Sequence, residues 1–220
     1  MEEIEQEERV RPIAVISGDI VRSTELEHSM YEDLLYTLHN QLSLIRSLNP
    51  NNKFEVTRGD SFQVLVQDIE NAATYALLLR TSLKSRNSNY DCRISLAIGH
   101  DVSIRHTIGS STGDAFTLSG RALDKMTTDT LKVSTLVQPF NEHFDLLTKY
   151  LDNQVSGMTE RQCAITYIVL KNQHSLTQKE IAELLGVNRV SVNRSIKSAN
   201  LNLITEYTQL FSQKVREFFL

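Results

Sequence analysis

The order of apolar patterns between residues 11 and 99 restricts this chain to few folds. Four short segments are rich in β-branched and apolar residues and are predicted as strands: 11–17, 54–57, 62–66 and 93–99. Two longer segments repeat apolar residues every three or four positions and are predicted as helices: 28–48 and 70–86. The resulting order is strand, helix, strand, strand, helix, strand. Each of these elements must bury an apolar face against the others.

This order is typical of a ferredoxin-like α+β fold, a mainly antiparallel sheet with helices on one face. Three further elements are predicted downstream: a helix at 114–126, a strand at 131–136 and a helix at 138–153. After Gly157 the periodicity is purely helical. We therefore expect a flexible N-terminus at 1–10, an α/β domain at 11–155 and an all-α module at 156–220.

Composition predicts a globular cytoplasmic protein. Hydrophobic residues make up 40% of the chain, which is enough for a packed core. The first residues are acidic and lack the apolar stretch of a signal peptide. No apolar run approaches the roughly 18 residues of a membrane span. Cys92 and Cys163 are far apart in apolar surroundings, so we expect two buried free thiols rather than a disulfide or a zinc site.

The net charge of −4 is unevenly distributed. Residues 157–220 hold eight Lys/Arg against five Asp/Glu, a balance of +3. Residues 1–156 hold 15 against 22, a balance of −7. A basic C-terminal piece on an acidic body indicates a DNA-binding module attached to a domain that does not bind DNA.

Two aspartates stand at turns that the predicted fold brings together. Asp19 follows the first strand, and Asp60 lies at the tip of the predicted hairpin. The first strand lies beside the hairpin in this fold, so the two carboxylates are expected to converge. Carboxylates at close range repel unless a cation separates them, and Mg²⁺ takes such ligands together with phosphate oxygens. The alternative is that both are ordinary turn residues.

Three segments resemble the catalytic domain of class III nucleotidyl cyclases, a relative of GGDEF and polymerase palm domains: Gly18–Thr24, Arg58–Phe62 and Gly113–Ala122. The resemblance covers about residues 12–126. It implies a divalent metal, Mg²⁺ or Mn²⁺, on Asp19, the carbonyl of Ile20 and Asp60. The accompanying nucleotide, such as a nucleoside triphosphate, is expected at the small or hydroxyl-rich positions of the first two segments: Gly18, Val21, Arg22, Ser23, Thr24 and Gly59.

The third segment implies the residues that act on the substrate. Thr117 stands where the family has a ribose-directing Asn, and Arg121 matches its phosphate-directing Arg. In that family a head-to-tail homodimer completes the site, so Thr117 and Arg121 of one copy would face the metal-binding carboxylates of the other. Val56 stands where the family has the residue that selects the base. Arg121 would stabilise charge developing on the phosphates.

Arg121 and two histidines that could be considered as metal ligands have simpler explanations. Arg121 is equally a surface arginine paired with Asp114 or Asp124. His100 and His106 have no third metal ligand at suitable spacing, so we expect them to be loop or strand-end residues.

The C-terminal module carries a second motif. Thr177 followed by Glu180 forms a capping box, and Gly186 ends that helix in a left-handed turn. A second helix, 188–199, buries Val192 and turns a polar, basic, acid-free face outward. The predicted DNA contacts are Thr177, Gln178, Asn188, Arg189, Ser191, Asn193, Arg194 and Lys197. The alternative is a helical bundle whose basic face is only solvated.

This segment resembles the helix-turn-helix of sigma region 4, and the whole chain resembles the SatD-type bacterial proteins. Residues 201–220 form an apolar stripe that is expected either to cover the DNA-binding core or to pack on a symmetry mate.

Three functions remain open from the sequence. The first is a transcriptional regulator that binds double-stranded DNA as a homodimer and senses Mg²⁺ with a nucleotide. The second is an active cyclase or nucleotidyltransferase that makes a nucleotide second messenger by attack of a ribose hydroxyl on the α-phosphate. The third is a degenerate domain used for dimerisation beside DNA binding. None of the three involves a membrane.

Overall fold

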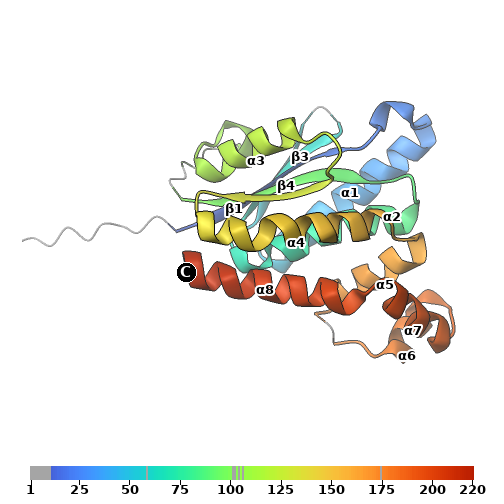
Figure 1. Cartoon of the computed structure of the whole chain (residues 1–220). Helices are drawn as coiled ribbons and strands as arrows, with labels where there is room; N and C mark the ends of the chain where they lie inside the picture. Colours follow the sequence, from blue (N-terminus) through green and yellow to red (C-terminus); the bar gives the residue numbers. More distant parts are fainter. Residues whose placement is uncertain (1–10, 58, 101–102, 104, 106, 174) are drawn as a thin grey trace, which may run out of the picture.

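The computed structural model describes residues 11–220 except 58, 101, 102, 104, 106 and 174, and shows a mixed α+β fold (Figure 1). The strands are β1 (Ile13–Ile20), β2 (Lys53–Thr57), β3 (Ser61–Val66), β4 (Cys92–Gly99) and β5 (Leu131–Thr135). The α-helices are α1 (His28–Leu48), α2 (Ala72–Arg86), α3 (Asp114–Lys125), α4 (Gln138–Ser156), α5 (Glu160–Lys171), α6 (Gln178–Leu185), α7 (Arg189–Ser198) and α8 (Leu201–Phe219). Short 3₁₀ turns are η1 (Ser23–Glu25), η2 (Ile69–Asn71) and η3 (Ile108–Ser110).

The sheet has the order β2-β3-β1-β4-β5. The central strand β1 pairs antiparallel with both β3 and β4, whereas β5 pairs parallel with β4. The first four strands therefore have the ferredoxin-like order that the sequence predicts, and β5 extends the sheet by one strand. The predicted α+β class is confirmed.

Helices cover both faces of the sheet, and the expectation of helices on one face is wrong. Ala14 and Ile16 of β1 belong to the large core that includes α1 and α2. Ile13 and Val15, on the opposite face, form a smaller cluster with residues of α3 such as Phe116. Because β1 is apolar on both faces, each face needs a cover. Figure 1 shows α3 on the side of the sheet opposite α4 and α8.

Strand β1 is longer than predicted. Gly18 and Asp19 were expected to form a turn, but they are part of the strand, where Gly18 lies opposite Phe62 and Asp19 opposite Ser61. A Cβ atom on Gly18 would lie 2.4 Å from the ring of Phe62 and 2.7 Å from the carbonyl oxygen of Arg93. This glycine therefore admits a packed ring and does not mark a turn.

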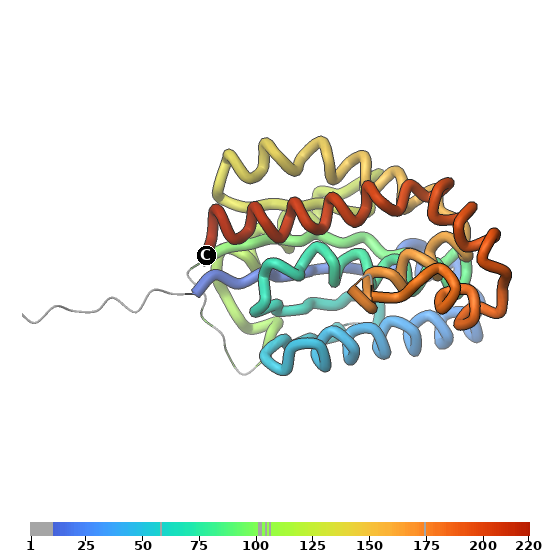
Figure 2. The backbone as a smooth tube through the Cα atoms, turned by 90° about the horizontal axis from the view of Figure 1, so that it is seen from below, coloured from blue at the N-terminus to red at the C-terminus, as the bar shows by residue number. Residues whose placement is uncertain are grey.

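The C-terminal helices share one continuous core with the α/β part. Figure 2 shows α8 running alongside α4. Helix α8 runs antiparallel to α4, since Gln154 bonds to Ala199 near one end and Phe140 contacts Phe219 near the other. Between these contacts, the hydroxyls of Thr148 and Tyr207 are 2.7 Å apart. The stripe on α8 thus packs on α4 through aromatic contacts, and α8 also contacts η2, α2 and α7. Neither expected location included α4. The division at 155/156 stays a prediction, and this core crosses it.

Two smaller expectations concern thiols and membranes. Cys92 and Cys163 are both free and buried, as predicted, and burial raises the pKa of each thiol. Within the described ranges, no helix combines the length and the apolar composition that crossing a membrane requires.

Candidate functional site

The turn after β1 and the β2–β3 hairpin meet at one end of the sheet. The main-chain N–H of Ile20 donates to the carbonyl oxygen of Asp60 at 3.1 Å. The hydroxyl of Ser23 donates to the carboxylate of Asp60 at 2.8 Å. Arg58, at the start of the same motif, lies outside the described residues. The fold thus joins the two segments that carry the predicted metal ligands.

The carboxylate of Asp19 is fully engaged by an arginine that the sequence reading missed. Arg93 donates from Nε to Oδ1 at 2.8 Å and from Nη2 to Oδ2 at 2.5 Å, and its Nη1 donates to the carbonyl oxygen of Met126 at 2.9 Å. This is a bidentate, charge-assisted pair. The register of β1 and β4 places Asp19 directly opposite Arg93. Strand pairing, which the local sequence does not encode, creates this contact.

This pairing bears directly on the metal prediction. Both oxygens of Asp19 are used by Arg93, while Asp60 accepts from Ser23, so the two carboxylates as arranged do not fit a shared cation. In the part of the chain that the structure describes, no group of three or more His, Cys, Asp or Glu residues is placed to hold a metal. The Mg²⁺ site therefore stays a prediction, and it requires Arg93 to release Asp19.

A hollow of about 390 Å³ opens beside the turn. Its lining is polar or aromatic apart from one leucine: Ser23, Thr24, Leu26, His28, Tyr31 and Asp60. Two backbone positions beside it have left-handed conformations, Arg22 at φ 53° and Gly59 at φ +82°. Such a conformation at a residue other than glycine costs on the order of 1–3 kcal/mol and often marks a functional site.

The main-chain amides limit where a phosphate could bind in this turn. The N–H of Ile20 donates to Asp60 and that of Val21 donates to the carbonyl oxygen of Asp91 at 3.0 Å. At Gly18 the ring of Phe62 fills the space that a phosphate would need. Phosphate binding, which stays a prediction here, would therefore rely on residues 22–24.

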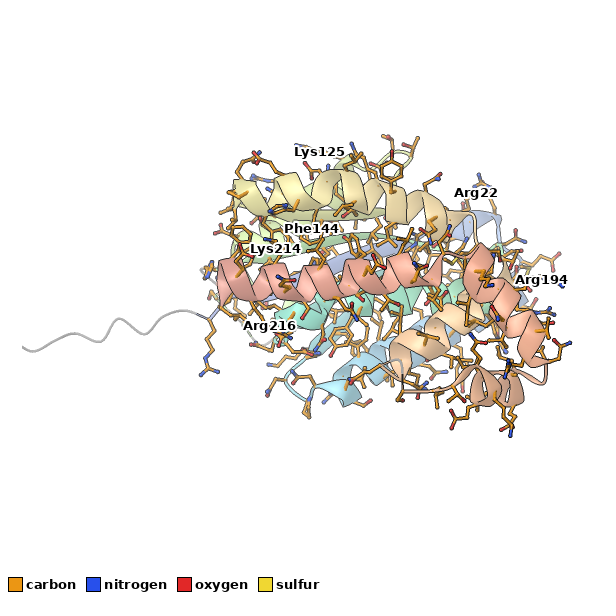
Figure 3. All side chains as sticks on the ribbon, turned by 60° about the horizontal axis from the view of Figure 1, so that its bottom comes forward. Arg22, Lys125, Phe144, Arg194, Lys214 and Arg216 are labelled. Atoms are coloured by element: carbon orange, nitrogen blue, oxygen red, sulfur yellow. The ribbon has the colours of Figure 1, made fainter. Side chains whose placement is uncertain are left out.

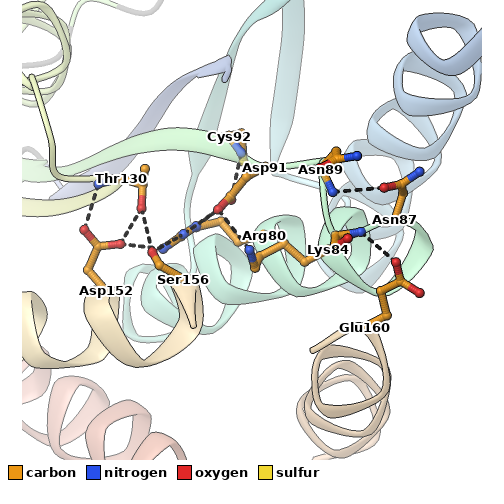
Figure 4. A network of polar contacts seen from close by, with 11 residues as sticks. Arg80, Lys84, Asn87, Asn89, Asp91, Cys92, Thr130, Asp152, Ser156 and Glu160 are labelled. Carbon is orange, nitrogen blue, oxygen red and sulfur yellow. Dashed lines mark hydrogen bonds and ion pairs between the residues drawn. The ribbon is translucent and has the colours of Figure 1, made fainter. Parts of the chain in front are cut away.

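A buried ion network lies next to this end of the sheet and joins α2 and α4 to Asp91, the residue before β4 (Figure 4). Arg80 of α2 donates two hydrogen bonds to Asp91, at 2.9 and 2.8 Å, and one to Asp152 of α4 at 2.7 Å. Lys84 adds a third cationic contact, 3.5 Å from Asp91. Burial alone would lower the pKa of Arg80, but Asp91 and Asp152 more than offset this and raise it. Because Asp91 also accepts from Val21, the network fixes the turn.

The two predicted substrate-directing residues of α3 face away from the sheet. Helix α3 buries Ala115, Phe116 and Ser119 against the sheet. Thr117 and Arg121, four positions apart, share the exposed outer face of that helix. The predicted completion of the site by a second copy stays a prediction.

The histidines are described in part. His100 is exposed and follows β4 directly, so it is the strand-end residue that was expected. His106 lies outside the described residues.

The predicted capping of the C-terminal motif is confirmed. Thr177 accepts from the N–H of Glu180 at 3.3 Å, and Glu180 accepts from the N–H of Thr177 at 2.7 Å. The main-chain N–H and the hydroxyl of Thr177 both donate to the carboxylate of Glu180, each at 2.7 Å, and these two bonds lower the pKa of Glu180. Gly186 has φ 63° and ends α6, and Asn188 caps α7 by accepting from the N–H of Ser191 at 2.8 Å. These contacts set the turn between α6 and α7.

The outer face of α7 is exposed and cationic. Val192 is buried, while Arg189, Arg194 and Lys197 are exposed. The other predicted DNA contacts divide into two groups: Asn188 and Thr177 are exposed and serve as helix caps, whereas Gln178, Ser191 and Asn193 are half-buried. Figure 3 shows Arg194 at the end of the molecule opposite Lys214 and Arg216.

Comparisons with known proteins gave distant structural matches only. The chain matches no protein-family model, and no curated protein matches it. It is similar in structure to a bacterial light-regulated adenylyl cyclase, at 16% identity and a TM-score of 0.43 over 56% of this chain and 75% of that one. It is similar to the GGEEF domain of a diguanylate cyclase from Vibrio cholerae, at 18% identity and a TM-score of 0.42 over 58% and 85%. It is also similar to the guanylyl cyclase Cya2, at 14% identity and a TM-score of 0.44 over 67% and 79%. The fold assignment rests on the sheet order given above.

Proposed function

We propose that this chain is a sequence-specific DNA-binding regulator that reads the major groove with α7. The observation that carries the proposal is the face of α7, which is exposed, cationic and free of acids next to the left-handed turn at Gly186. In helix-turn-helix proteins the second helix of such a pair enters the major groove through its first residues. In that arrangement α6 would cross the DNA backbone.

The side chains on α7 suit different parts of a duplex. Arg189 and Arg194 have the planar donor pairs that match the major-groove edge of guanine. The amide of Asn193 suits adenine, although this side chain is half-buried. Lys197, in the last turn, suits a phosphate, which supplies affinity without sequence information.

The test is selection of duplexes from a random library, followed by gel shifts with the selected sequence. Wild type should retard it in preference to unrelated DNA. The double variant Arg189→Ala/Arg194→Ala should lose that preference, because it removes two base-reading groups without disturbing buried residues. Arg216→Ala, an exposed arginine at the far end of α8, is the matched control and should bind as wild type does. Failure to enrich any sequence would contradict the proposal.

A second candidate function is nucleotide binding at the hollow beside the β1–α1 turn. It is favoured by the hydrogen bonds that join this turn to the hairpin and by the left-handed backbone at Arg22. A bound nucleotide would make the chain a ligand-responsive regulator, and attack of a ribose hydroxyl on the α-phosphate would make it a cyclase. The resemblance to cyclase motifs supports both possibilities and selects neither.

Thermal shift with each nucleoside triphosphate, with and without Mg²⁺ or Mn²⁺, tests this candidate. Stabilisation that Asp60→Asn removes and that Asp145→Asn, an exposed control on α4, retains would support the hollow as the site. Pyrophosphate release measured on the same variants distinguishes an enzyme from a sensor. If no triphosphate stabilises the protein with either metal, the domain serves only to hold the DNA-binding module.

A further inference from the structure

A groove between α4 and α8 is lined almost entirely by apolar and neutral side chains. Its volume is about 820 Å³, and its residues are Leu147, Tyr150, Leu151, Asn153, Gln154, Asn200, Leu203, Glu206, Tyr207 and Leu210. Glu206 is the one ionisable carboxylate among them. Figure 1 shows α4 and α8 side by side. The fold already uses the inner sides of these helices, so the groove belongs to their outer sides.

Large apolar side chains protrude at this groove and beside it. Of the residues that line the groove, Tyr150 is 68% exposed and Leu203 51%. Leu146, the neighbour of the lining residue Leu147, is 62% exposed. They lie on the same two helices, whereas isolated exposed apolar residues are scattered over ordinary surfaces. A contiguous apolar patch of this kind marks an interaction site.

We propose that a second copy of this chain covers the groove, forming a twofold dimer through α4 and α8. A twofold interface joins a surface patch to itself, so it needs a hollow and a protrusion on the same patch. Here the hollow is the groove and the protrusions are Tyr150 and Leu203. Tyr150 of each copy fills the groove of the other, and the uncharged lining becomes the interface core.

The charges at the rim are complementary between two copies. Lys149 and Glu206 are both exposed, and neither belongs to the ion pairs formed among the described residues. Lys149 directly precedes Tyr150, and Glu206 lines the groove that Tyr150 of the second copy would enter. A twofold arrangement therefore pairs the lysine of each copy with the glutamate of the other, twice per dimer.

The position of the groove also suits the proposed DNA binding, on which this part of the inference rests. On the α8 side, the first residue that lines the groove is Asn200, which lies between α7 and α8. Pairing along α8 therefore joins two α7 helices in one symmetric assembly, as a palindromic site requires. This interface does not involve α3, so it differs from the head-to-tail dimer that the cyclase motifs imply.

Sedimentation velocity of the full chain over a wide concentration range tests the dimer. Wild type should sediment as a dimer. The variant Tyr150→Ser/Leu203→Ser should raise the dimer dissociation constant roughly 30-fold or more, because central interface side chains dominate such affinities. Tyr36→Ser is the matched control, since Tyr36 is also 68% exposed but lies on α1, and it should leave the dimer intact. Circular dichroism confirms that each variant is folded.

Exchanging the two charges gives a second test of the dimer, because a folding defect in one variant would not be reversed by the second substitution. Lys149→Glu and Glu206→Lys should each weaken the dimer, and the double exchange should restore it. A monomeric wild type, or a dimer that Tyr150→Ser/Leu203→Ser leaves unchanged, would overturn the inference. A dimer that binds no DNA would leave this interface standing and refute the proposed function.

Discussion

Two arginine–aspartate pairs in this molecule use the same chemistry in different surroundings. Arg80 and Arg93 each donate two hydrogen bonds to one aspartate, Asp91 and Asp19 respectively. The side chain of Arg80 is completely buried and also donates to Asp152. The side chain of Arg93 is 34% exposed, and its third acceptor is a main-chain carbonyl.

This difference in burial implies different roles for the two ion pairs. Removing one partner of a buried pair leaves an uncompensated charge, which is strongly destabilising. A half-buried pair such as Arg93–Asp19 is partly screened by water and contributes less to stability than a fully buried one. We therefore interpret the Arg80 network as a fixed support that joins α2, β4 and α4. The Arg93–Asp19 pair is instead one that a ligand could exchange.

The largest expected effect is that of breaking the buried network. Arg80→Met should lower the free energy of unfolding by about 3–5 kcal/mol, because Asp91 and Asp152 both lose their buried cation. Urea denaturation followed by circular dichroism measures this loss. Arg93→Met is the matched control, expected to cost about 1 kcal/mol or less. Equal losses in the two variants would remove the distinction between the pairs.

A smaller effect is expected from neutralising one acid of the same network. Asp152 accepts from Arg80 and from both the N–H and the hydroxyl of Thr130. Asp152→Asn keeps the shape but loses the charge, and should cost about 1.5–3 kcal/mol in urea denaturation. Asp145→Asn, an exposed change on the same helix, should be close to neutral. A near-neutral Asp152→Asn would show that α4 is held by its apolar contacts alone.

The pH dependence of stability should also report on the buried network. Burial raises the pKa of Asp91, but Arg80 and Lys84 more than offset this, so its folded-state pKa lies below the ordinary value of 3.8. The stabilisation is therefore fully present above that value and is lost as the pH falls through the folded-state pKa. Urea midpoints measured into this acid range should fall less steeply in Asp91→Asn than in wild type. Identical slopes would contradict the assignment.

The smallest effect on stability, and the most informative on function, is expected at the Arg93–Asp19 pair. Arg93→Ala should change the free energy of unfolding by about 1 kcal/mol or less. It should also free both oxygens of Asp19 and so increase the affinity for Mn²⁺, measured by isothermal titration calorimetry. Adding Asp19→Asn to this variant should abolish the gain. If Arg93→Ala binds Mn²⁺ no better than wild type, Asp19 is not a latent metal ligand.

Local sequence patterns predicted much of the fold. The helix at 28–48 has the observed bounds because Leu34, Leu38, Leu42 and Ile45 repeat on one face and are all buried. The capping box of Thr177 and Glu180 and the glycine turn at Gly186 were equally readable, since both depend on residues close together in the sequence.

Contacts between residues far apart in the sequence could not be predicted from such local patterns. Gly18 looks like a turn signal, yet its role is set by Phe62 on a neighbouring strand. Arg93 and Asp19 are 74 positions apart, and only the register of β1 and β4 places them opposite each other. Arg80 gave one usable signal, a charge within the apolar run of α2, which is typical of a buried ion pair.

The central claim, that α7 reads DNA sequence, is tested most directly by a ratio of affinities. Fluorescence anisotropy should measure wild type, Arg194→Ala and Lys197→Ala on the selected duplex and on a scrambled duplex of equal length. The account predicts that Arg194→Ala weakens binding to the selected duplex by about 1–3 kcal/mol and leaves binding to the scrambled duplex almost unchanged. It predicts that Lys197→Ala weakens both equally and reduces the salt dependence. An Arg194→Ala variant that keeps the wild-type ratio would contradict the claim.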